Sequence, residues 1–208
     1  PEVEQIYNPL PFVSDEVSPL DEKRCIAAGR LEIQKNFKDL IKAWKTVDGR
    51  HPDWTLSIFG KGSQENELRN LIKDSGLAGK VILEGGTSDI RKELLDSSCL
   101  VMSSRYEGFP MVLLEALTTG LPIVSYDCPK GPSEIVTIGA NGYLAKVGDT
   151  VTLAQGICSV IANEDLRRRF GAESKRRSEN FTLEKTMERW DRLFSSLTTS
   201  RTRTSPEG

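Results

Sequence analysis

The sequence predicts an α/β fold, a Rossmann-like doubly wound parallel sheet with a helical C-terminal extension. Two observations lead to this prediction. Short apolar runs alternate with longer amphipathic segments over the first two thirds of the chain, which is typical of repeated strand–helix–strand units. From about residue 150 onward the pattern is helical only. The length of 208 residues suits one large domain.

Short, largely apolar runs of three or four residues predict buried strands, because strands covered on both faces lack polar alternation. The predicted strands are Cys25–Ala28, Leu56–Phe59, Val81–Leu83, Leu100–Ser103, Ile123–Ser125 and Tyr143–Ala145. Helices between them are predicted at Phe37–Val47, Glu65–Asp74, Asp89–Leu95 and Met111–Thr119, and later ones at Thr152–Ala162, Glu164–Asn180 and Leu183–Leu197. Gly49, Gly76 and Gly120 stand where glycine commonly ends a helix.

The chain is predicted to have four parts. Residues 1–22 carry several prolines and no periodic pattern, so we expect a linker arriving from a domain outside this sequence. The start at Pro1 rather than Met also indicates a piece of a longer protein. Residues 23–180 are expected to form the α/β domain, and residues 181–197 a C-terminal helix. Residues 198–208 have no apolar content and predict a disordered tail.

Composition and charge argue against several classes of function. The formal net charge of −2 comes without a basic stripe for nucleic acid, and no apolar run approaches the roughly 20 residues of a membrane helix. The single histidine, His51, precedes a proline in an expected turn. A catalytic triad built around a histidine is therefore not expected. No Asp-x-Asp motif or ligand cluster indicates a metal. The four separated cysteines predict free thiols in a reducing cytoplasm: Cys25, Cys99, Cys128 and Cys158.

The loop after the first predicted strand carries two cations, Arg30 and Lys35. Doubly wound sheets bind ligands at the carboxyl ends of their strands, so this loop is a candidate site. Asn36 is expected to cap the following helix, with Asp39 in the capping-box position. An arginine and a lysine beside a helix N-terminus suit a pyrophosphate, the alternative being two solvated surface charges. The glycine fingerprints of dehydrogenases and P-loop proteins are absent after this strand.

The loop after the fourth predicted strand leads into a helix that is apolar almost all round, yet Glu115 lies in its second turn. A carboxylate there costs several kcal/mol unless it is paired or hydrogen-bonded. One interpretation is a buried salt bridge to Arg30 or Arg105. The other is that Glu115 accepts hydrogen bonds from ligand hydroxyls such as a ribose diol. Glu107, on the loop itself, would then meet the ligand further along.

The run from Glu107 to Glu115, E-G-F-P-M-V-L-L-E, resembles the E-x7-E motif of retaining GT-B glycosyltransferases of family 4. The loop 29–36 resembles the phosphate-binding loop of the same family. Further similar motifs follow in the expected order at Gly120–Val124, Gly131–Val136 and Asn141-Gly142. The resemblance runs from about Cys25 to Leu197. It implies that the chain is one half of a GT-B fold, the donor-binding half, and that an N-terminal acceptor domain is missing.

The resemblance also implies roles for the matching residues. The implied catalytic residues are Arg30 and Lys35, which hold the diphosphate, and Glu107, which contacts the sugar hydroxyls. The implied donor-binding residues are Gly29, Gly86, Gly108, Phe109, Pro110, Glu115 and Lys130. Among them Glu115 holds the ribose, and Gly86 belongs to the loop Gly85-Gly86-Thr87, which lies near the base. Lys130 is a hypothesis for a third cation, with a solvent-facing lysine as the alternative.

The implied activity is transfer of a hexose from a nucleotide-diphospho-sugar to a polysaccharide, a glycolipid or a lipid-linked glycan. The resemblance favours UDP as the nucleotide and leaves GDP and ADP open. No metal or cofactor is expected, because the cations and helix N-termini take over the phosphate charge. The C-terminal helix would cross back to the missing domain, and the protein would be cytoplasmic, at the inner face of the membrane through that domain or the acceptor. The 208-residue chain alone is expected to bind nucleotide weakly and to transfer no sugar.

Three other functions remain open. A non-catalytic nucleotide-sugar-binding or regulatory module would keep every binding residue named above. A sugar phosphorylase or epimerase would need further catalytic groups, which the sequence does not offer. A structural interaction domain would leave the charge in the apolar helix without a reason.

Overall fold

Six parallel strands form one sheet in the computed structural model, which describes residues 4–202 and the side chains of residues 4–197. The strands are β1 (Arg24–Ala28), β2 (Thr55–Phe59), β3 (Val81–Gly85), β4 (Cys99–Met102), β5 (Ile123–Tyr126) and β6 (Gly142–Ala145). Their order across the sheet is β3-β2-β1-β4-β5-β6. The chain therefore reverses its direction of growth between β1 and β4. This is the topological switch point, where doubly wound sheets bind ligands.

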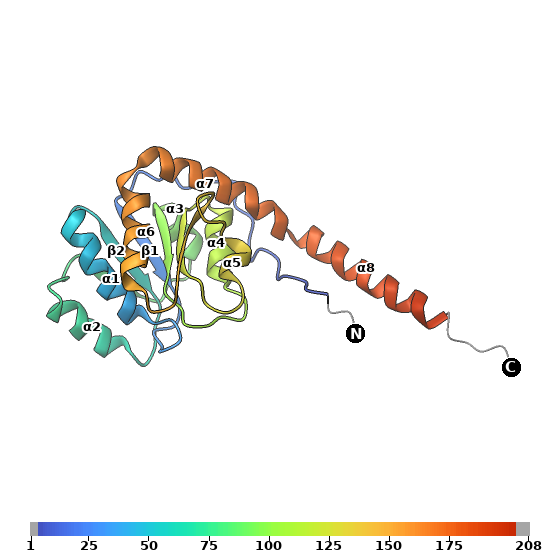
Figure 1. The fold of residues 1–208 in the computed structure, drawn as a ribbon, viewed down its shortest axis with the longest axis horizontal. Coiled ribbons are helices and arrows are strands. Elements are labelled where there is room, and N and C mark those ends of the chain that lie inside the picture. Colours follow the sequence, from blue (N-terminus) through green and yellow to red (C-terminus); the bar gives the residue numbers. More distant parts are fainter. Residues whose placement is uncertain (1–3, 203–208) are drawn as a thin grey trace.

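Helices cover both faces of the sheet, as predicted (Figure 1). The helical elements are α1 (Phe37–Arg50), α2 (Glu65–Asp74), α3 (Ile90–Leu95), α4 (Met111–Thr118), α5 (Pro132–Ile135), α6 (Thr150–Ala162), α7 (Glu164–Ser178), the 3-10 turn η1 (Glu179–Phe181) and α8 (Leu183–Thr202). Successive side chains of β1 point to opposite faces. Cys25 and Ala27 join the core under α1, α2 and α6, and Ile26 joins the core under α3 and α4.

Most predicted boundaries lie within a few residues of the observed ones, and those of α2 coincide. Gly76 and Gly120 follow α2 and α4 in the left-handed region, with φ of +74° and +71°, as expected for glycines that end helices. The prediction for Gly49 was wrong, because α1 continues to Arg50. Helix α5 was not predicted, since four residues beginning with Pro132 show no helical periodicity.

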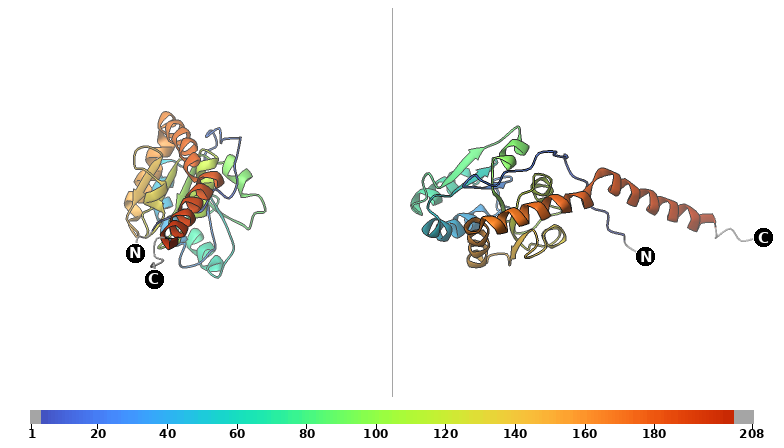
Figure 2. Two further views of the ribbon diagram at one scale, coloured as in Figure 1. Left: turned by 90° about the vertical axis from the view of Figure 1, so that its right-hand side faces the viewer. Right: turned by 90° about the horizontal axis from the view of Figure 1, so that it is seen from above.

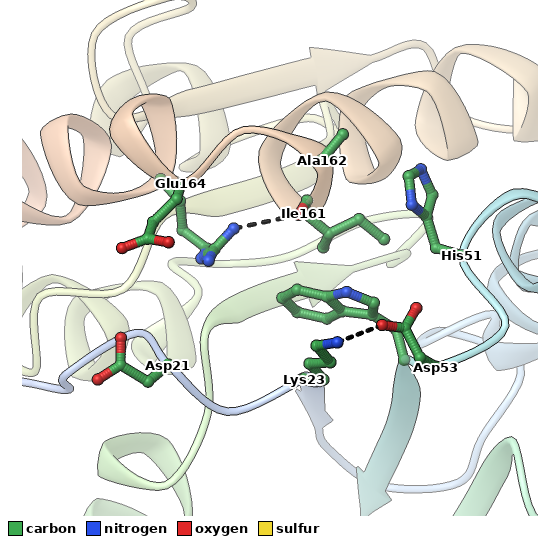
Figure 3. Close-up of a pocket in the computed structure, with 9 residues that line it drawn as sticks. Asp21, Lys23, His51, Asp53, Ile161, Ala162 and Glu164 are labelled. Carbon is green, nitrogen blue, oxygen red and sulfur yellow. Dashed lines mark hydrogen bonds and ion pairs between the residues drawn. The ribbon is translucent and has the colours of Figure 1, made fainter.

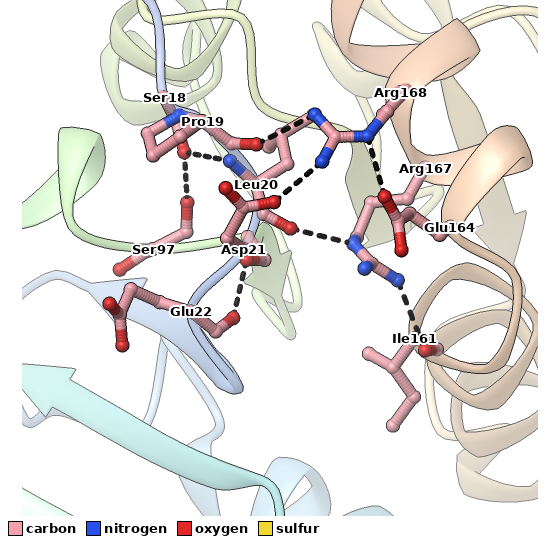
Figure 4. Close-up of polar contacts among 11 residues, drawn as sticks. Ser18, Pro19, Leu20, Asp21, Glu22, Ser97, Ile161, Glu164, Arg167 and Arg168 are labelled. Carbon is pink, nitrogen blue, oxygen red and sulfur yellow. Dashed lines mark hydrogen bonds and ion pairs between the residues drawn. The ribbon is translucent and has the colours of Figure 1, made fainter.

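The segment 4–22 contains no helix or strand, yet part of it is held tightly against the domain (Figure 4). The Arg167 guanidinium donates from Nε to the Leu20 carbonyl at 3.0 Å. Arg168 Nη2 lies 2.6 Å from Asp21 Oδ1. Both arginines belong to α7, so this helix fixes the path by which the chain enters β1. A sequence pattern that predicts a linker does not show such side-chain-to-backbone contacts.

Helix α8 projects away from the body of the domain (Figures 1 and 2). Its backbone is helical to Thr202, so it continues beyond Leu197, where the sequence predicted the tail to begin. Residues 203–208 of the predicted disordered tail lie outside the described part of the chain. Exposed apolar side chains recur along α8 at helical spacing: Leu183, Met187, Trp190 and Leu197. None of the helices in the described range has the length and apolar content that a membrane span requires.

Candidate functional site

The loops that follow β1 and β4 are joined at the switch point. Arg105 N donates to the Gln34 carbonyl at 2.8 Å, and Gln34 Nε2 donates to the Tyr106 carbonyl at 2.9 Å. Ser103 Oγ donates to the Lys35 carbonyl at 2.8 Å. Adjacent parallel strands end at the same edge of a sheet, so two loops 70 residues apart in sequence become neighbours. The two loops that the sequence singled out therefore form one surface.

A cavity of about 340 Å³ opens at this edge of the sheet. Four predicted site residues line it: Gly29, Arg30, Gly86 and Glu115. Thr87, from the loop expected near the base, also lines it, and the remaining lining residues were not predicted to bind, namely Ala28, Phe59, Gly60, Lys61 and Ile90. Several of these follow β2 and β3, so the rule that loops after strands bind ligands could have found them. Lys61 adds a cation, and its Cε would lie 3.4 Å from a Cβ placed on Gly86.

Lys35 and Glu107 form an ion pair beside this cavity, with Lys35 Nζ 2.7 Å from Glu107 Oε1. The side chains are 18% and 8% exposed, so solvent screens the pair less than it screens surface pairs. Gly29 makes room for the lysine, because a Cβ at this position would lie 2.8 Å from Lys35 Cε. The phosphate-binding candidate and the sugar-binding candidate are thus in direct contact.

The Lys35–Glu107 pair is expected to show strong coupling in a double-mutant cycle. Lys35→Met leaves the nearly buried Glu107 carboxylate without its partner, whereas adding Glu107→Gln removes that charge. We expect the double variant to be more stable than the sum of the single effects predicts, by about 1 kcal/mol. Thermal or urea unfolding of the four proteins measures this, and strictly additive effects would show that the pair is energetically independent.

Glu115 lies in α4, is half-buried and faces the cavity. Burial raises the pKa of this carboxyl above its usual value. The alternative of a salt bridge to Arg30 or Arg105 is wrong, because the described residues include no ion pair of Glu115. Arg105 instead points to Asn36 Oδ1 at 3.5 Å. Glu115 therefore offers an unpaired acceptor to whatever occupies the cavity.

Asn36 does not cap α1 in the predicted manner. Its φ of 53° places it in the left-handed region, and its side chain makes no capping hydrogen bond. Nδ2 of Asn36 donates to Asp39 Oδ2 at 2.7 Å instead, so the two residues satisfy each other. The side chain therefore does not cover the first N–H groups of α1, and Lys35 next to this end is engaged by Glu107.

The remaining predicted site residues, Gly108, Phe109, Pro110 and Lys130, do not line the cavity. Gly108 is exposed, and the Phe109 ring stacks on Tyr7 with centroids 5.2 Å apart. Pro110 precedes α4 and contacts the backbone at Gly131, where a Cβ would lie 2.2 Å from Pro110 Cδ. Lys130 is exposed with a φ of 64°, and it does not line the cavity. The structure thus brings the loop after β5 against the start of α4, and leaves Lys130 at its surface.

Gly60 keeps the loops after β1 and β2 close together. With a φ of +151°, a Cβ at Gly60 would lie 1.9 Å from the Gly29 carbonyl oxygen. Gly79, with a φ of +75°, has no atom within 4 Å of such a Cβ. We therefore expect Gly60→Ala to destabilise the fold by about 1–2 kcal/mol more than Gly79→Ala. Equal losses in thermal unfolding of the two variants would contradict this close approach.

The four cysteines are free, as predicted, and all four are buried. Cys128 is the one beside the ion pair. Burial, with a further contribution from the Glu107 charge, raises its pKa to about 11, so the thiol stays protonated at neutral pH. No group of three or more metal-binding side chains occurs among the described residues.

A second cavity of about 420 Å³ lies at the opposite ends of β1 and β2, around Lys23 and Trp54 (Figure 3). Its charged groups already have partners. Lys23 pairs with Asp53 at 2.5 Å, while the Arg167 guanidinium lies 5.4 Å from the Trp54 ring and donates to the Ile161 carbonyl. Ligands of doubly wound sheets bind at the carboxyl ends of the strands, which makes the first cavity the better candidate.

Comparisons with known proteins identify the family. Residues 12–177 match the family described as "Glycosyl transferases group 1". An exopolysaccharide phosphotransferase of Streptomyces coelicolor is 34% identical over 97% of this chain and 21% of its own length. The amylovoran biosynthesis glycosyltransferase AmsD of Erwinia amylovora is 32% identical over 86% of this chain and 50% of its own length. The chain therefore spans between about a fifth and a half of these two relatives.

Among solved structures, a mutant of TarM from S. aureus in complex with Fondaparinux, alpha-GlcNAc-glycerol and UDP has a similar fold. Its TM-score is 0.83 at 27% identity, over 93% of this chain and 40% of the TarM chain. The parallel sheet, the order of its helices and the family match agree with one another. The chain belongs to the group 1 glycosyl transferases.

Proposed function

We propose that this chain is the donor-binding domain of a retaining glycosyltransferase of family 4, which transfers a hexose from a UDP-sugar to a polysaccharide, glycolipid or similar acceptor. The main support for this proposal is that the cavity of about 340 Å³ at the carboxyl edge of the sheet is lined by the cation Arg30 and by Glu115, which is half-buried and unpaired. A ligand that bears both an anion and a diol complements this pair. A nucleoside diphosphate has both groups.

In the proposed complex, Arg30 grips the diphosphate with its planar guanidinium. Lys35 lies on the same loop and is held by Glu107, so it reaches the phosphates from a fixed direction. The Glu107 carboxylate keeps its second oxygen for a sugar hydroxyl, since the ion pair uses Oε1. Phosphates, lysine, glutamate and sugar would then form one continuous polar network.

The reaction breaks the bond between the anomeric carbon and the diphosphate oxygen, and the electron pair leaves with the nucleotide. Negative charge therefore develops on the diphosphate in the transition state. In this proposal Arg30 and Lys35 stabilise that charge, which is supported by Arg30 lining the cavity and by Lys35 lying on the same loop. No metal is required in this proposal, because the cations that it uses are side chains. Glu107 binds hydroxyls and takes no part as an acid or base.

The ribose is assigned to Glu115, whose carboxylate faces the cavity. An ionised carboxylate accepts hydrogen bonds from both hydroxyls of a 2′,3′-diol. The loop at Gly86 and Thr87, on the same cavity, is left for the base. The TarM mutant that resembles this chain was crystallised with UDP, which supports UDP as the nucleotide.

The acceptor is proposed to bind an N-terminal domain in the longer protein, since the chain spans only part of its relatives. Helix α8 is proposed to cross to that domain, and its exposed apolar residues, among them Trp190, support this. An acceptor at a membrane would place the protein at the inner, cytoplasmic face.

Calorimetric titration of the 208-residue chain with UDP, GDP and ADP tests the donor-site proposal. Saturable binding of UDP, tighter than that of the other two, is the expected result. Tighter binding of GDP or ADP would show that the donor carries guanine or adenine in place of uracil. No binding of any nucleotide would contradict a donor site in this chain. A transfer assay on the longer protein separates a transferase from a module that only binds nucleotide-sugars.

A further inference from the structure

Tyr7, which lies 100 residues away in sequence, contacts the candidate sugar-binding loop. Its ring stacks on Phe109 with centroids 5.2 Å apart and planes inclined by 16°. Phe109 follows Glu107 by two residues. The residues around Tyr7 contact the same region, because Gln5 Nε2 donates to Glu134 Oε2 at 2.9 Å. Segment 5–8 therefore covers the start of α4 and the neighbouring α5.

The other side of Tyr7 faces the junction of η1 and α8. The Tyr7 and Phe181 centroids are 5.9 Å apart, and the Arg189 guanidinium carbon lies 5.8 Å from the Tyr7 centroid. Leu10 N donates to the Phe181 carbonyl at 2.7 Å, which ties the same segment to η1. Figure 1 shows this segment beside the start of α8. Tyr7 thus lies between the candidate sugar-binding loop around Glu107, called the donor loop below, and the C-terminal helix α8.

The donor loop needs such a support. Gly108 is exposed, and no atom lies within 4 Å of a Cβ placed there, so nothing packs against that side of this residue. The loop is held on one side by the Lys35–Glu107 ion pair and on the other by the Phe109 ring. The rings of Tyr7 and Phe181 both contact Phe109. Without the ring contacts, the loop would be held on one side only, by the Lys35–Glu107 ion pair and by the hydrogen bonds of Arg105 and Tyr106 to Gln34.

We propose that Tyr7 is a positioning residue of the donor site: its ring holds Phe109 and thereby fixes Glu107 and Gly108 against the bound nucleotide-sugar. The inference rests on the proposed function of the site. It also couples the site to α8, because Arg189 and Phe181 hold the other side of the same ring. The ring carries the effect, so phenylalanine is expected to replace tyrosine.

Two measurements on the 208-residue chain test this, namely hydrogen exchange of the amides between Arg105 and Val112 and calorimetric titration with UDP. A stacked aromatic pair contributes enough that Tyr7→Ala is expected to speed exchange in this loop and to weaken UDP binding by about fivefold. Tyr7→Phe is expected to restore both to within about twofold of the original chain. A residue with a merely general structural role would instead change exchange throughout the sheet.

Phe12→Ala is the matched control. Phe12 lies on the same irregular segment 4–22 and packs against the same core, but among the described residues its ring makes no contact with the Phe109 ring. It should lower the unfolding midpoint and leave loop exchange and UDP affinity unchanged. Unaltered loop exchange in Tyr7→Ala, or unaltered UDP affinity in a chain that binds UDP, would overturn the inference. Failure of the original chain to bind UDP refutes the proposed function, and loop exchange then decides the role of Tyr7 alone.

Discussion

The variant Arg30→Ala/Lys35→Ala is expected to bind UDP at least about 100-fold more weakly than the original chain. Each cation would make charge-assisted hydrogen bonds to the diphosphate, and each such bond is worth about 1.5–3 kcal/mol. Both residues lie on the loop after β1 at the switch point, one lining the cavity and one beside it. Calorimetric titration gives the dissociation constants.

The control variant Arg69→Ala/Lys73→Ala removes the same two residue types from the exposed surface of α2. It should bind UDP as the original chain does. Because losing Lys35 also leaves Glu107 unpaired, Arg30→Ala is tested alone as well. Arg30 is exposed and forms no ion pair in the described part of the chain, so this single variant should fold normally and still lose about tenfold in affinity. Undiminished UDP binding by the double variant would move the phosphate site elsewhere.

Glu115→Gln is expected to stabilise the fold at neutral pH while weakening UDP binding by at least about 30-fold. Weaker binding follows because the amide offers one acceptor oxygen where the carboxylate offers two for a ribose diol. Higher stability follows because burial raises the pKa of the Glu115 carboxyl. A substitution that stabilises the fold but weakens ligand binding is typical of a position whose residue serves binding and not stability.

Glu115 makes the stability of the original chain depend on pH. A raised pKa means that the folded state binds the Glu115 proton more tightly than the unfolded state does. The original chain therefore loses stability as the pH rises from the ordinary carboxyl value near 4.5 through the raised value. The advantage of Glu115→Gln should appear over that range, persist at pH 7 and vanish below about pH 4.

Glu67→Gln is a control of opposite sign, because a hydrogen bond from Lys38 lowers the pKa of Glu67. This exposed carboxylate should confer a small stability above its ordinary pKa, which the variant lacks. Thermal unfolding of each variant between about pH 3 and pH 7.5 measures both effects. A Glu115→Gln chain that is less stable than the original at pH 7, or that binds UDP equally well, would refute an unpaired ribose acceptor.

The layout of the fold could be predicted from the sequence because its signals are local. Apolar runs identified the strands, and a periodic pattern gave α2 its observed boundaries. The rule that ligands bind beyond the carboxyl ends of strands then selected the loops after β1 and β4. Arg30 of the first loop and Glu115 of the helix after the second line one cavity in the structure. Helix α5 has only four residues and no period to detect, so it was missed.

The contacts between distant segments could not be predicted. Spacing does not show that Lys35 pairs with Glu107, because 72 residues separate them and only the strand order brings them together. For Glu115, the apolar pattern of its helix predicted burial, but the sequence could not place Arg30 or Arg105 relative to it. A salt bridge and a ligand contact were therefore both predicted as alternatives. The support of Phe109 by Tyr7 depends on the path of an irregular segment, which has no periodic signal.

Amide NMR shifts show where the nucleotide binds, and so test whether its site is the cavity lined by Arg30 and Glu115. The 208-residue chain, labelled with ¹⁵N, is titrated with UDP. Saturable shifts are expected in residues 29–36, around Gly86, and from Glu107 to Glu115, with the surroundings of Trp54 unchanged. Shifts concentrated around the opposite cavity at Lys23 and Trp54 would contradict this expectation, and so would the absence of saturable shifts.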